Sequence, residues 1–481
     1  MVSALLSCST VDRIPAELRP LADPAELRPR IVHFGLGAFH RAHQAVYTEA
    51  AAARTGQPWG IVAVGPRSAA PVEAARAQDC LFSVTDRVPG AGRTRVVGSV
   101  LDALRMREDA ARIDELIASP QITTITLTVT EKGYTRDPAT GLLDTADPDV
   151  AADLAATAVS DPAPMRTVAG RLTASLAARF RRCGAPVNVV SCDNAAGNGA
   201  ALAAVVRGFA EASAWPDRDA LLDWLAASAA FPATVVDRIV PASTGADRAA
   251  AEKALGVRDE TAVAGEPFRQ WVLEDRFAAD RPAWETDGAL VVPDAAPYQL
   301  MKLRLLNGSH SLLAYLGLAA GCGTVAEAVA ADWGERAVRR FTGEVTASLP
   351  GGLDVAGYVE DLITRFANPA IAHRLRQIGS DGSLKILQRW LGPLRERGVT
   401  PMLVLALAAW VNATRPGENG GQVFGTADPA AVALARCWQH PDKVVTRLLM
   451  TIGAADLAED RDLVSSIQAH LPALAAGRVE L

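Results

Sequence analysis

The spacing of hydrophobic and polar residues changes character near residue 293 of this 481-residue chain. Before that point, short runs of apolar and β-branched residues alternate with amphipathic stretches of helical spacing. Alternating strands and helices are typical of a parallel sheet that helices cover on both faces, so we expect an α/β fold over residues 1–293. The strongest strand signals are residues 31–34, 59–65, 123–129 and 186–190.

Residues 294–481 show helical spacing throughout, with no strand signal of comparable strength. A chain of this length is too long for a single hydrophobic core. We therefore expect a second, mainly α-helical domain over residues 294–481, with the boundary after residue 293. Residues 1–29 are expected to form an extended leader that crosses the surface.

The first strand of the chain runs into a Gly-x-Gly turn and then into a helix. Two such glycines let the backbone approach a pyrophosphate, so the pattern predicts a Rossmann-type NAD(P)-binding domain. The third glycine of the usual motif is absent, because His40 stands in its place. A plain strand-turn-helix is the alternative. The predicted cofactor contacts at this turn are Gly35, Gly37, Ala38 and Phe39.

The end of the second strand is where a dinucleotide-binding protein reads the adenosine ribose. No acidic residue stands there, but Arg67 and Ser68 do. Arg67 can hold a 2′-phosphate. We therefore predict NAD as cofactor and leave NADP open.

Two later strands also end in polar residues, Thr130 and Glu131 in one case and Asp193 and Asn194 in the other. The carboxyl ends of parallel strands form the ligand crevice of an open α/β sheet. We predict that Thr130 and Glu131 contact the cofactor and that Asn194 donates to a substrate oxygen. The alternatives are a solvated turn and a helix cap made by Asp193 or Asn194.

The segment 298–311 combines helical apolar spacing with Lys302, Asn307 and His310. At about 100° per residue, Asn307 lies about 140° and His310 about 80° from Lys302, which gives one broad polar face. A lysine among Leu and Met loses hydration, which moves its pKa toward neutrality and suits a general base. The alternative is an amphipathic helix whose lysine reaches back to solvent.

Composition excludes several classes of function. A net charge of −6 gives no basic surface for nucleic acid or an anionic membrane. The six cysteines show no CxxC pair or other metal-ligand spacing, so we expect reduced thiols in a cytoplasmic protein without a metal. We predict no signal peptide and no membrane span, and a small molecule as partner.

Six segments in one order resemble the mannitol dehydrogenase family of metal-independent polyol and uronate dehydrogenases. They are residues 33–43, 128–134, 191–194, 236–239, 266–272 and the segment of Lys302, Asn307 and His310. The resemblance implies that Lys302 is the general base and that Asn194 and Asn307 stabilise the developing alkoxide. It further implies that His310 orients substrate hydroxyls, that Asp237 lies near the substrate, and that the protein is a monomer or weak oligomer.

One position departs from the family. Mannitol dehydrogenases carry a glutamate three residues before the lysine, linked with proton passage to solvent, and this chain has Gln299. A glutamine cannot accept a proton as a carboxylate does, so the proton route or the pH dependence of turnover is expected to differ.

Three cations resemble the fructuronate reductase branch more than the mannitol branch: Lys132, Arg269 and Arg374. A guanidinium is well shaped to bind a substrate carboxylate, although Arg269 can equally form an ion pair with Glu266 or Asp237. We predict the interconversion of D-mannonate and D-fructuronate. The alternatives are a mannitol 2-dehydrogenase type of polyol dehydrogenase and a non-catalytic sugar or nucleotide sensor.

Overall fold

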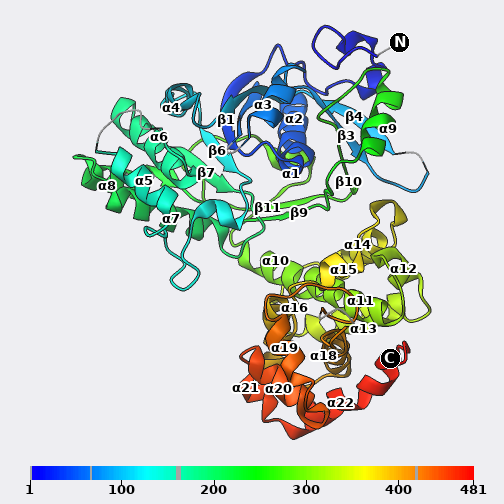
Figure 1. Ribbon diagram of the computed structural model, residues 1–481. Helices are drawn as coiled ribbons and strands as arrows, with labels where there is room; N and C mark the ends of the chain where they lie inside the picture. Colours follow the sequence, from blue (N-terminus) through cyan, green and yellow to red (C-terminus); the bar gives the residue numbers. More distant parts are fainter. Residues whose placement is uncertain (1–2, 66–67, 91, 159–163, 418–420) are drawn as a thin grey trace. The chain divides into compact units, whose positions relative to one another are not determined.

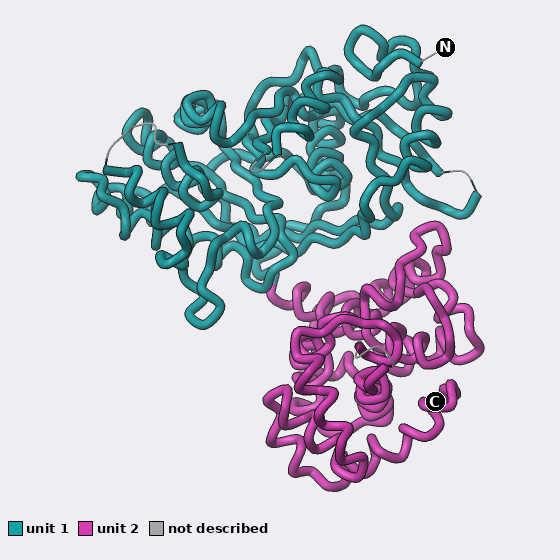
Figure 2. Tube along the Cα trace, viewed as in Figure 1, with its two compact units in different colours: residues 1–295 teal, residues 296–481 magenta. Residues whose placement is uncertain are grey.

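The computed structural model describes residues 3–65, 68–90, 92–158, 164–417 and 421–481. The chain divides into two compact units, Met1–Ala295 and Ala296–Leu481, each with its own core (Figure 2). No helix among the described residues is both long and apolar enough to cross a bilayer.

The first unit is built on a six-stranded, fully parallel sheet (Figure 1). Its strand order is β5-β2-β1-β6-β7-β8, so the chain builds outward from β1 in one direction and then restarts beside β1 at β6. That reversal is the topological switch point at which open α/β sheets bind ligands. The strands are β1 Arg28–Phe34, β2 Trp59–Gly65, β5 Val100–Arg105, β6 Thr124–Leu127, β7 Val187–Ser191 and β8 Ala229–Ala230.

Side chains alternate between the two faces of this sheet and pack into two separate cores. In β1, Val32 and Phe34 join one core, while Ile31 joins the other. The first core includes residues from the helices α4 Ala110–Ile117, α6 Val168–Arg182, α7 Asn198–Ala212 and α8 Arg218–Ser228. The second includes residues from α1 Ala38–Ala42, α2 Gln44–Thr55 and α3 Ala69–Arg76.

Two three-stranded sheets complete the first unit. One has the order β10-β3-β4, with β10 Val263–Gly265, β3 Phe82–Asp86 and β4 Arg93–Val97. The other has the order β12-β11-β9, with β12 Leu290–Val292, β11 Gln270–Glu274 and β9 Thr234–Asp237. The remaining elements of this unit are α5 Pro148–Ala156, α9 Gly245–Leu255 and the 3-10 helices Glu131–Tyr134 and Trp284–Asp287.

The leader does not have the extended form that the sequence suggested. It contains two 3-10 helices, Val11–Arg13 and Ala16–Leu18. Leu6 and Ile14 are buried against a small separate core. Most other residues of the leader are partly or fully exposed, so only its extended form was predicted wrongly. The two apolar side chains gain from burial against residues far along the chain.

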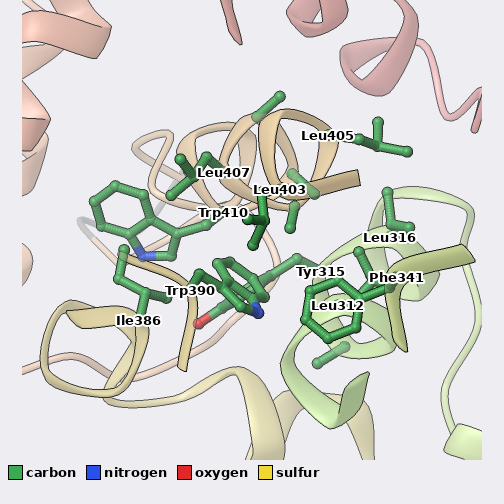
Figure 3. Close-up of a cluster of buried hydrophobic side chains, with 14 of the residues drawn as sticks. Leu312, Tyr315, Leu316, Phe341, Ile386, Trp390, Leu403, Leu405, Leu407 and Trp410 are labelled. Atoms are coloured by element: carbon green, nitrogen blue, oxygen red, sulfur yellow. The ribbon is translucent and has the colours of Figure 1, made fainter. Parts of the chain in front are cut away.

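The described residues of the second unit form helices joined by turns and loops, with no strand, and the unit is organised around α11 Gly308–Ala319 and α18 Pro401–Ala413, which are buried on almost every side. Figure 3 shows Leu312 and Tyr315 of α11 among Leu403, Leu407 and Trp410 of α18.

The other elements of this unit surround that pair (Figure 1). They are α10 Ala296–Met301, α12 Val325–Ala330, α13 Gly334–Thr346, α14 Val355–Phe366, α15 Leu375–Gly379, α16 Gly382–Ile386, α17 Gly392–Arg397, α19 Ala431–Cys437, α20 Val444–Thr451, α21 Ala455–Ala458, α22 Arg461–Ala475, the π-helices Lys302–Asn307 and Leu387–Leu391, and the 3-10 helices Pro369–Ile371 and Pro441–Lys443.

Candidate active site

The glycine turn follows β1 at the switch point of the sheet. Gly35 has a φ of +123°, and a Cβ atom there would lie 2.5 Å from the carbonyl oxygen of Thr128. Both the backbone conformation and the lack of space therefore require glycine. Gly37 precedes α1, where a Cβ would meet nothing within 4 Å, and Ala38 and Phe39 open that helix. The turn leaves its outer side free of side-chain bulk, as a dinucleotide requires.

A stacked pair of buried histidines lies beneath this turn. The rings of His33 and His40 are 3.5 Å apart and nearly parallel. The two ring nitrogens of His33 form hydrogen bonds with Thr126 Oγ1 at 2.7 Å and Thr128 Oγ1 at 2.8 Å. Burial lowers the pKa of His40 to about 3 and that of His33 well below its usual value. His40, which replaces the third glycine, is therefore a neutral packing residue.

The parallel register brings three strand ends to one level. Phe34 of β1 pairs with Leu127 of β6, and Leu127 pairs with Ser191 of β7. The predicted residues Gly35, Thr130, Glu131, Lys132 and Asn194 follow these strand ends in sequence, so they lie at one edge of the sheet. Thr130, Glu131, Lys132 and Asn194 are exposed there. Arg67, the residue predicted for a 2′-phosphate, lies outside the described residues.

Asp193 organises this edge through a closed set of hydrogen bonds. Its carboxylate accepts from the backbone N–H groups of Val129 at 3.2 Å and Thr130 at 2.7 Å, and from the hydroxyl of Tyr134 at 2.8 Å. These bonds hold Thr130 at a φ of +69°, which is uncommon for a residue with a side chain. Burial raises the pKa of Asp193.

The alternative in which Asp193 or Asn194 caps the following helix was wrong. The N-cap residue of α7 is Gly197, and it makes no side-chain cap. Asp193 cannot serve as a cap because its carboxylate is occupied by the preceding loop. Sequence reasoning missed Tyr134 as its partner, although Tyr134 lies in the same short motif.

Asp237 and Arg269 lie around the β12-β11-β9 sheet. Asp237 ends β9, is buried, and pairs in register with Gln270 of β11. Arg269 forms an ion pair with Asp287 at 2.5 Å, and its guanidinium lies 4.3 Å from the ring centroid of Tyr47. The expected ion-pair partners of Arg269, Glu266 and Asp237, are thereby corrected to Asp287. That Arg269 binds a substrate carboxylate stays a prediction. Its guanidinium already has a counter-charge in Asp287.

Lys302 begins a π-helix, Lys302–Asn307, inserted between α10 and α11. A π-helix pairs residues five apart, so the angles of about 140° and 80° derived for an α-helix are wrong. Such segments occur frequently at functional sites. Lys302 is only 8% exposed, beside the buried Met301, Leu305 and Leu306.

His310 follows in the first turn of α11 and keeps unused hydrogen-bonding capacity. Its ring packs on Phe366 at 4.4 Å between centroids and on the edge of His373 at 5.3 Å. Its Nε2 is buried and has no hydrogen-bond partner among the described residues. Burial lowers the pKa of His310 well below its usual value, and nearby charges, including Arg365, Arg389 and Lys302, lower it further. A neutral imidazole here can donate to or accept from a hydroxyl.

Asn307 ends the π-helix and is partly buried. Its carbonyl oxygen accepts from Arg389 Nη1 at 3.2 Å, and that of Gly308 accepts from Trp390 Nε1 at 3.2 Å. Arg389 and Trp390 belong to the second π-helix, so side chains of one π-helix hold the backbone at the end of the other. The sequence analysis missed Arg389. The only available signal was that an arginine stands within an apolar stretch of helical spacing.

Arg374 has other neighbours than Lys302, Asn307 and His310. It is exposed, and it borders a depression of about 500 Å³ together with Cys322, Arg376 and Phe424. None of Lys302, Asn307 and His310 lines that depression. Its predicted role in substrate binding stays a prediction. Among the described residues, no three His, Cys, Asp or Glu side chains are grouped as metal ligands.

A parallel sheet whose switch point carries a glycine turn, followed by a helical unit with a buried lysine, defines a two-domain oxidoreductase of the dinucleotide-binding class. The mannitol dehydrogenase Rossmann domain matches residues 29–286, and the mannitol dehydrogenase C-terminal domain matches residues 294–475. The chain therefore belongs to the mannitol dehydrogenase family, whose members are oxidoreductases that act on CH–OH groups.

Individual relatives cover nearly the whole chain. The D-mannonate oxidoreductase of Escherichia coli (strain K12) is 37% identical over 467 residues, covering 94% of each chain. The mannitol 2-dehydrogenase of Cereibacter sphaeroides is 36% identical over 467 residues, covering 95% of this chain and 96% of its own. The solved ternary complex of Pseudomonas fluorescens mannitol 2-dehydrogenase with NAD and D-mannitol is 33% identical, with a TM-score of 0.79, and the match covers 98% of this chain and 96% of that one.

Proposed function

We propose that this protein is an NAD(P)-dependent oxidoreductase that interconverts a secondary alcohol and a ketone on an open-chain sugar acid, D-mannonate and D-fructuronate. The observation that carries the proposal is the buried Lys302 beside the neutral His310, in a family of CH–OH oxidoreductases. Similarity to the D-mannonate oxidoreductase over 94% of both chains supports the choice of substrate.

Lys302 is the proposed general base. In the oxidation direction its neutral amine accepts the proton of the reacting hydroxyl, and in the reduction direction its ammonium returns that proton to the carbonyl oxygen. Surroundings of Met301, Leu305 and Leu306 disfavour the charged form of the amine, which helps it to act near neutral pH. A nicotinamide dinucleotide, when bound, would supply the hydride chemistry at the carbinol carbon.

Three other side chains are proposed to manage the charge and position of the substrate. The side-chain amides of Asn194 and Asn307 donate to the oxygen on which negative charge develops, which stabilises the transition state more than the ground state. His310 Nε2, which is buried without a described partner, takes a hydroxyl of the open-chain substrate. Asp237 is proposed to contact another substrate hydroxyl.

The residues present fit a dinucleotide, because the backbone turn at Gly35 leads to Gly37, where no atom lies within 4 Å of the place that a Cβ would take. We propose that Gly35, Gly37, Ala38 and Phe39 approach the pyrophosphate, and that Thr130 and Glu131 contact the rest of the cofactor. Gln299, one turn before Lys302, supplies no carboxylate for proton passage. The lysine is therefore proposed to exchange its proton with solvent by a route that does not use that position.

A mannitol 2-dehydrogenase type of activity is the second candidate. The Cereibacter sphaeroides enzyme covers this chain as completely as the D-mannonate oxidoreductase does, at 36% against 37% identity. The two substrates differ in one group, since a uronate carries a carboxylate where the ketose carries a primary alcohol.

The test is NADH oxidation by the purified protein with D-fructuronate and, in parallel, D-fructose, each repeated with NADPH. We expect D-fructuronate to give the higher kcat/KM. A preference for D-fructose would replace the substrate proposal with the polyol alternative. Cofactor binding without turnover of either sugar, or of a wider set of ketoses, would favour a sensor and contradict the proposal.

A further inference from the structure

Arg389 is a partly buried cation attached to the segment that carries the proposed catalytic residues. Its Nη1 donates to the carbonyl oxygen of Asn307 at 3.2 Å and to the hydroxyl of Ser311 at 2.7 Å. Burial lowers the pKa of Arg389 only to about 10, so the guanidinium stays charged at neutral pH. Its charge also acts on His310 and lowers the pKa of that ring. Arg389 thus places a fixed positive charge near the end of the π-helix.

The other edge of the same guanidinium is unused. Among the described residues, Nε and Nη2 of Arg389 have no hydrogen-bond partner, and no carboxylate lies within ion-pair distance of the side chain. Neither atom is among the fully buried ones, so both are accessible to a ligand. The Nε and Nη2 edge of an arginine is planar and matches the two oxygens of a carboxylate.

Two other buried arginines show what satisfies such a group elsewhere in the described part of the chain. Arg179 in α6 has no carboxylate either, but its Nε, Nη1 and Nη2 all donate to backbone carbonyl oxygens. Arg304, in the same π-helix as Lys302, donates through both terminal nitrogens to the carboxylate of Glu396. All three nitrogens of Arg179 thus donate to backbone, and the two terminal nitrogens of Arg304 donate to a carboxylate, whereas Nε and Nη2 of Arg389 have neither kind of partner.

Several positive charges lie near Arg389, while the carboxylates of Asp381 and Asp428 act on Lys385 and Tyr315, on which Arg389 also acts. Lys302, Arg365 and Arg389 all act on His310 as positive charges, and the charge of Arg389 also acts on Lys385. A partly buried charge without a counter-ion is costly, and an anionic ligand removes that cost. A neutral sugar would supply only hydroxyl oxygens, whereas a sugar acid brings a carboxylate of the matching shape.

We propose that Arg389 binds the carboxylate of an open-chain sugar acid through Nε and Nη2, and that this contact makes the enzyme prefer uronates over neutral ketoses. Its Nη1 donates to the backbone of Asn307 at the same time. The carboxylate would therefore be held at a fixed position relative to the segment that carries Lys302, Asn307 and His310. This inference rests on the proposed function and names the residue that sets its substrate class. Arg269 and Arg374 are the competing candidates.

The experiment compares kcat/KM for D-fructuronate and D-fructose in wild type, Arg389→Gln, Arg389→Lys and Ser311→Ala. Loss of a charged, bidentate contact lowers kcat/KM by about 10- to 100-fold. We expect Arg389→Gln to lower kcat/KM for D-fructuronate by that factor and to change D-fructose by less than about threefold. Arg389→Lys keeps the charge but loses the fork, so its preference is expected to fall part of the way.

Ser311→Ala is the matched control. It removes one hydrogen bond to Nη1 and leaves the Nε and Nη2 edge intact, so the preference for D-fructuronate is expected to persist. Equal losses on both sugars in Arg389→Gln would show that the arginine only fastens the two π-helices, and would overturn the inference. If Arg389→Gln did not fold, an unchanged preference in Arg389→Lys would overturn it in the same way.

Failure of this inference is distinguishable from failure of the proposed function. A wild-type enzyme that reduces D-fructose but not D-fructuronate overturns both. A wild-type preference for D-fructuronate that survives Arg389→Gln but is lost in Arg269→Gln or Arg374→Gln leaves the function standing and moves the carboxylate contact to that residue.

Discussion

The two regions that carry the proposed site differ in how far their buried polar groups are satisfied. At the edge of the parallel sheet, the carboxylate of Asp193 accepts from two backbone N–H groups and from Tyr134. Around the π-helix of the second unit, His310 Nε2 and the Nε and Nη2 edge of Arg389 have no partner among the described residues. The buried carboxylate of Asp193 is thus fully used within the protein, whereas these groups around the π-helix are not.

The difference separates scaffold from recognition. Buried polar groups in native proteins are nearly always hydrogen-bonded, and a saturated network holds the backbone in one conformation. A buried group with spare capacity needs a ligand or water to complete it, and such groups concentrate at functional sites. On this basis, substitutions that break the hydrogen bonds of Asp193 should cost stability, and substitutions around the π-helix should cost activity.

The largest expected effect tests the helical side of this comparison. Lys302→Ala removes the proposed base, so kcat should fall by about 10²- to 10⁴-fold. Because the substitution leaves the residues that are proposed to contact the cofactor unchanged, NADH binding, measured by fluorescence titration, should persist. Lys253→Ala, on the exposed surface of α9, is the control. Turnover within tenfold of wild type would refute the assignment of Lys302.

An intermediate effect concerns Glu49 of α2, a fully buried carboxylate of the first unit. It accepts from the backbone N–H of Gly98 at 2.6 Å and pairs with Arg95 at 3.0 Å, yet burial raises its pKa from 4.5 to about 7. The folded protein thus keeps this proton to a higher pH than the unfolded chain does. The resulting stability is fully present below about pH 4.5 and is lost as the pH rises through about 7, a change of about 3 kcal/mol.

Glu49→Gln cannot ionise, so it should not show that loss. Urea unfolding of both proteins at pH 5 and pH 8 measures the free energy of unfolding. Between these pH values, the free energy of unfolding of the variant should rise by about 3 kcal/mol relative to that of wild type. Such a result would sharpen the comparison of the two regions, because it would show that burial destabilises the charged form even of a carboxylate that has partners. A difference between the two proteins that does not change with pH would contradict the raised pKa.

The smallest expected effect tests the sheet edge. Tyr134→Phe removes a hydroxyl that donates to the charged Asp193, so the free energy of unfolding should fall by about 1.5–3 kcal/mol, with kcat/KM changed by less than about tenfold. Tyr315→Phe is the matched control in the second unit. Its hydroxyl donates to the neutral carbonyl oxygen of Gly379 at 2.9 Å, so the loss should be only about 0.5–1.5 kcal/mol. A larger loss for Tyr315→Phe would reverse the comparison.

Much of the architecture could be predicted from the sequence, because it depends on local periodicity. The alternation of β-branched runs and helical stretches predicted a Rossmann-type sheet, and the later helical spacing predicted a helical domain; the family matches and the strand order confirm both. The extended form of the leader was predicted wrongly, since the partners that bury Leu6 and Ile14, such as Leu81 and Val96, are distant in the chain.

The candidate site was accessible to the sequence only as residue types. Gly35 was readable because a Gly-x-Gly turn after a strand is a local sequence pattern, whereas the contact with Thr128 that also requires glycine there is tertiary. The π-helix was not readable, because a shift of the hydrogen-bond register from four to five residues changes no residue type.

The sequence by itself determined the family, the two kinds of domain and the side chains available for chemistry, since these follow from short-range patterns and residue identity. Only the tertiary structure decided which cations have counter-charges. Arg269 has Asp287 and Arg304 has Glu396, whereas Arg389 has no carboxylate partner among the described residues. The physical reason is that charges pair through space, so the spare capacity that marks a recognition group appears only when distant segments are folded together.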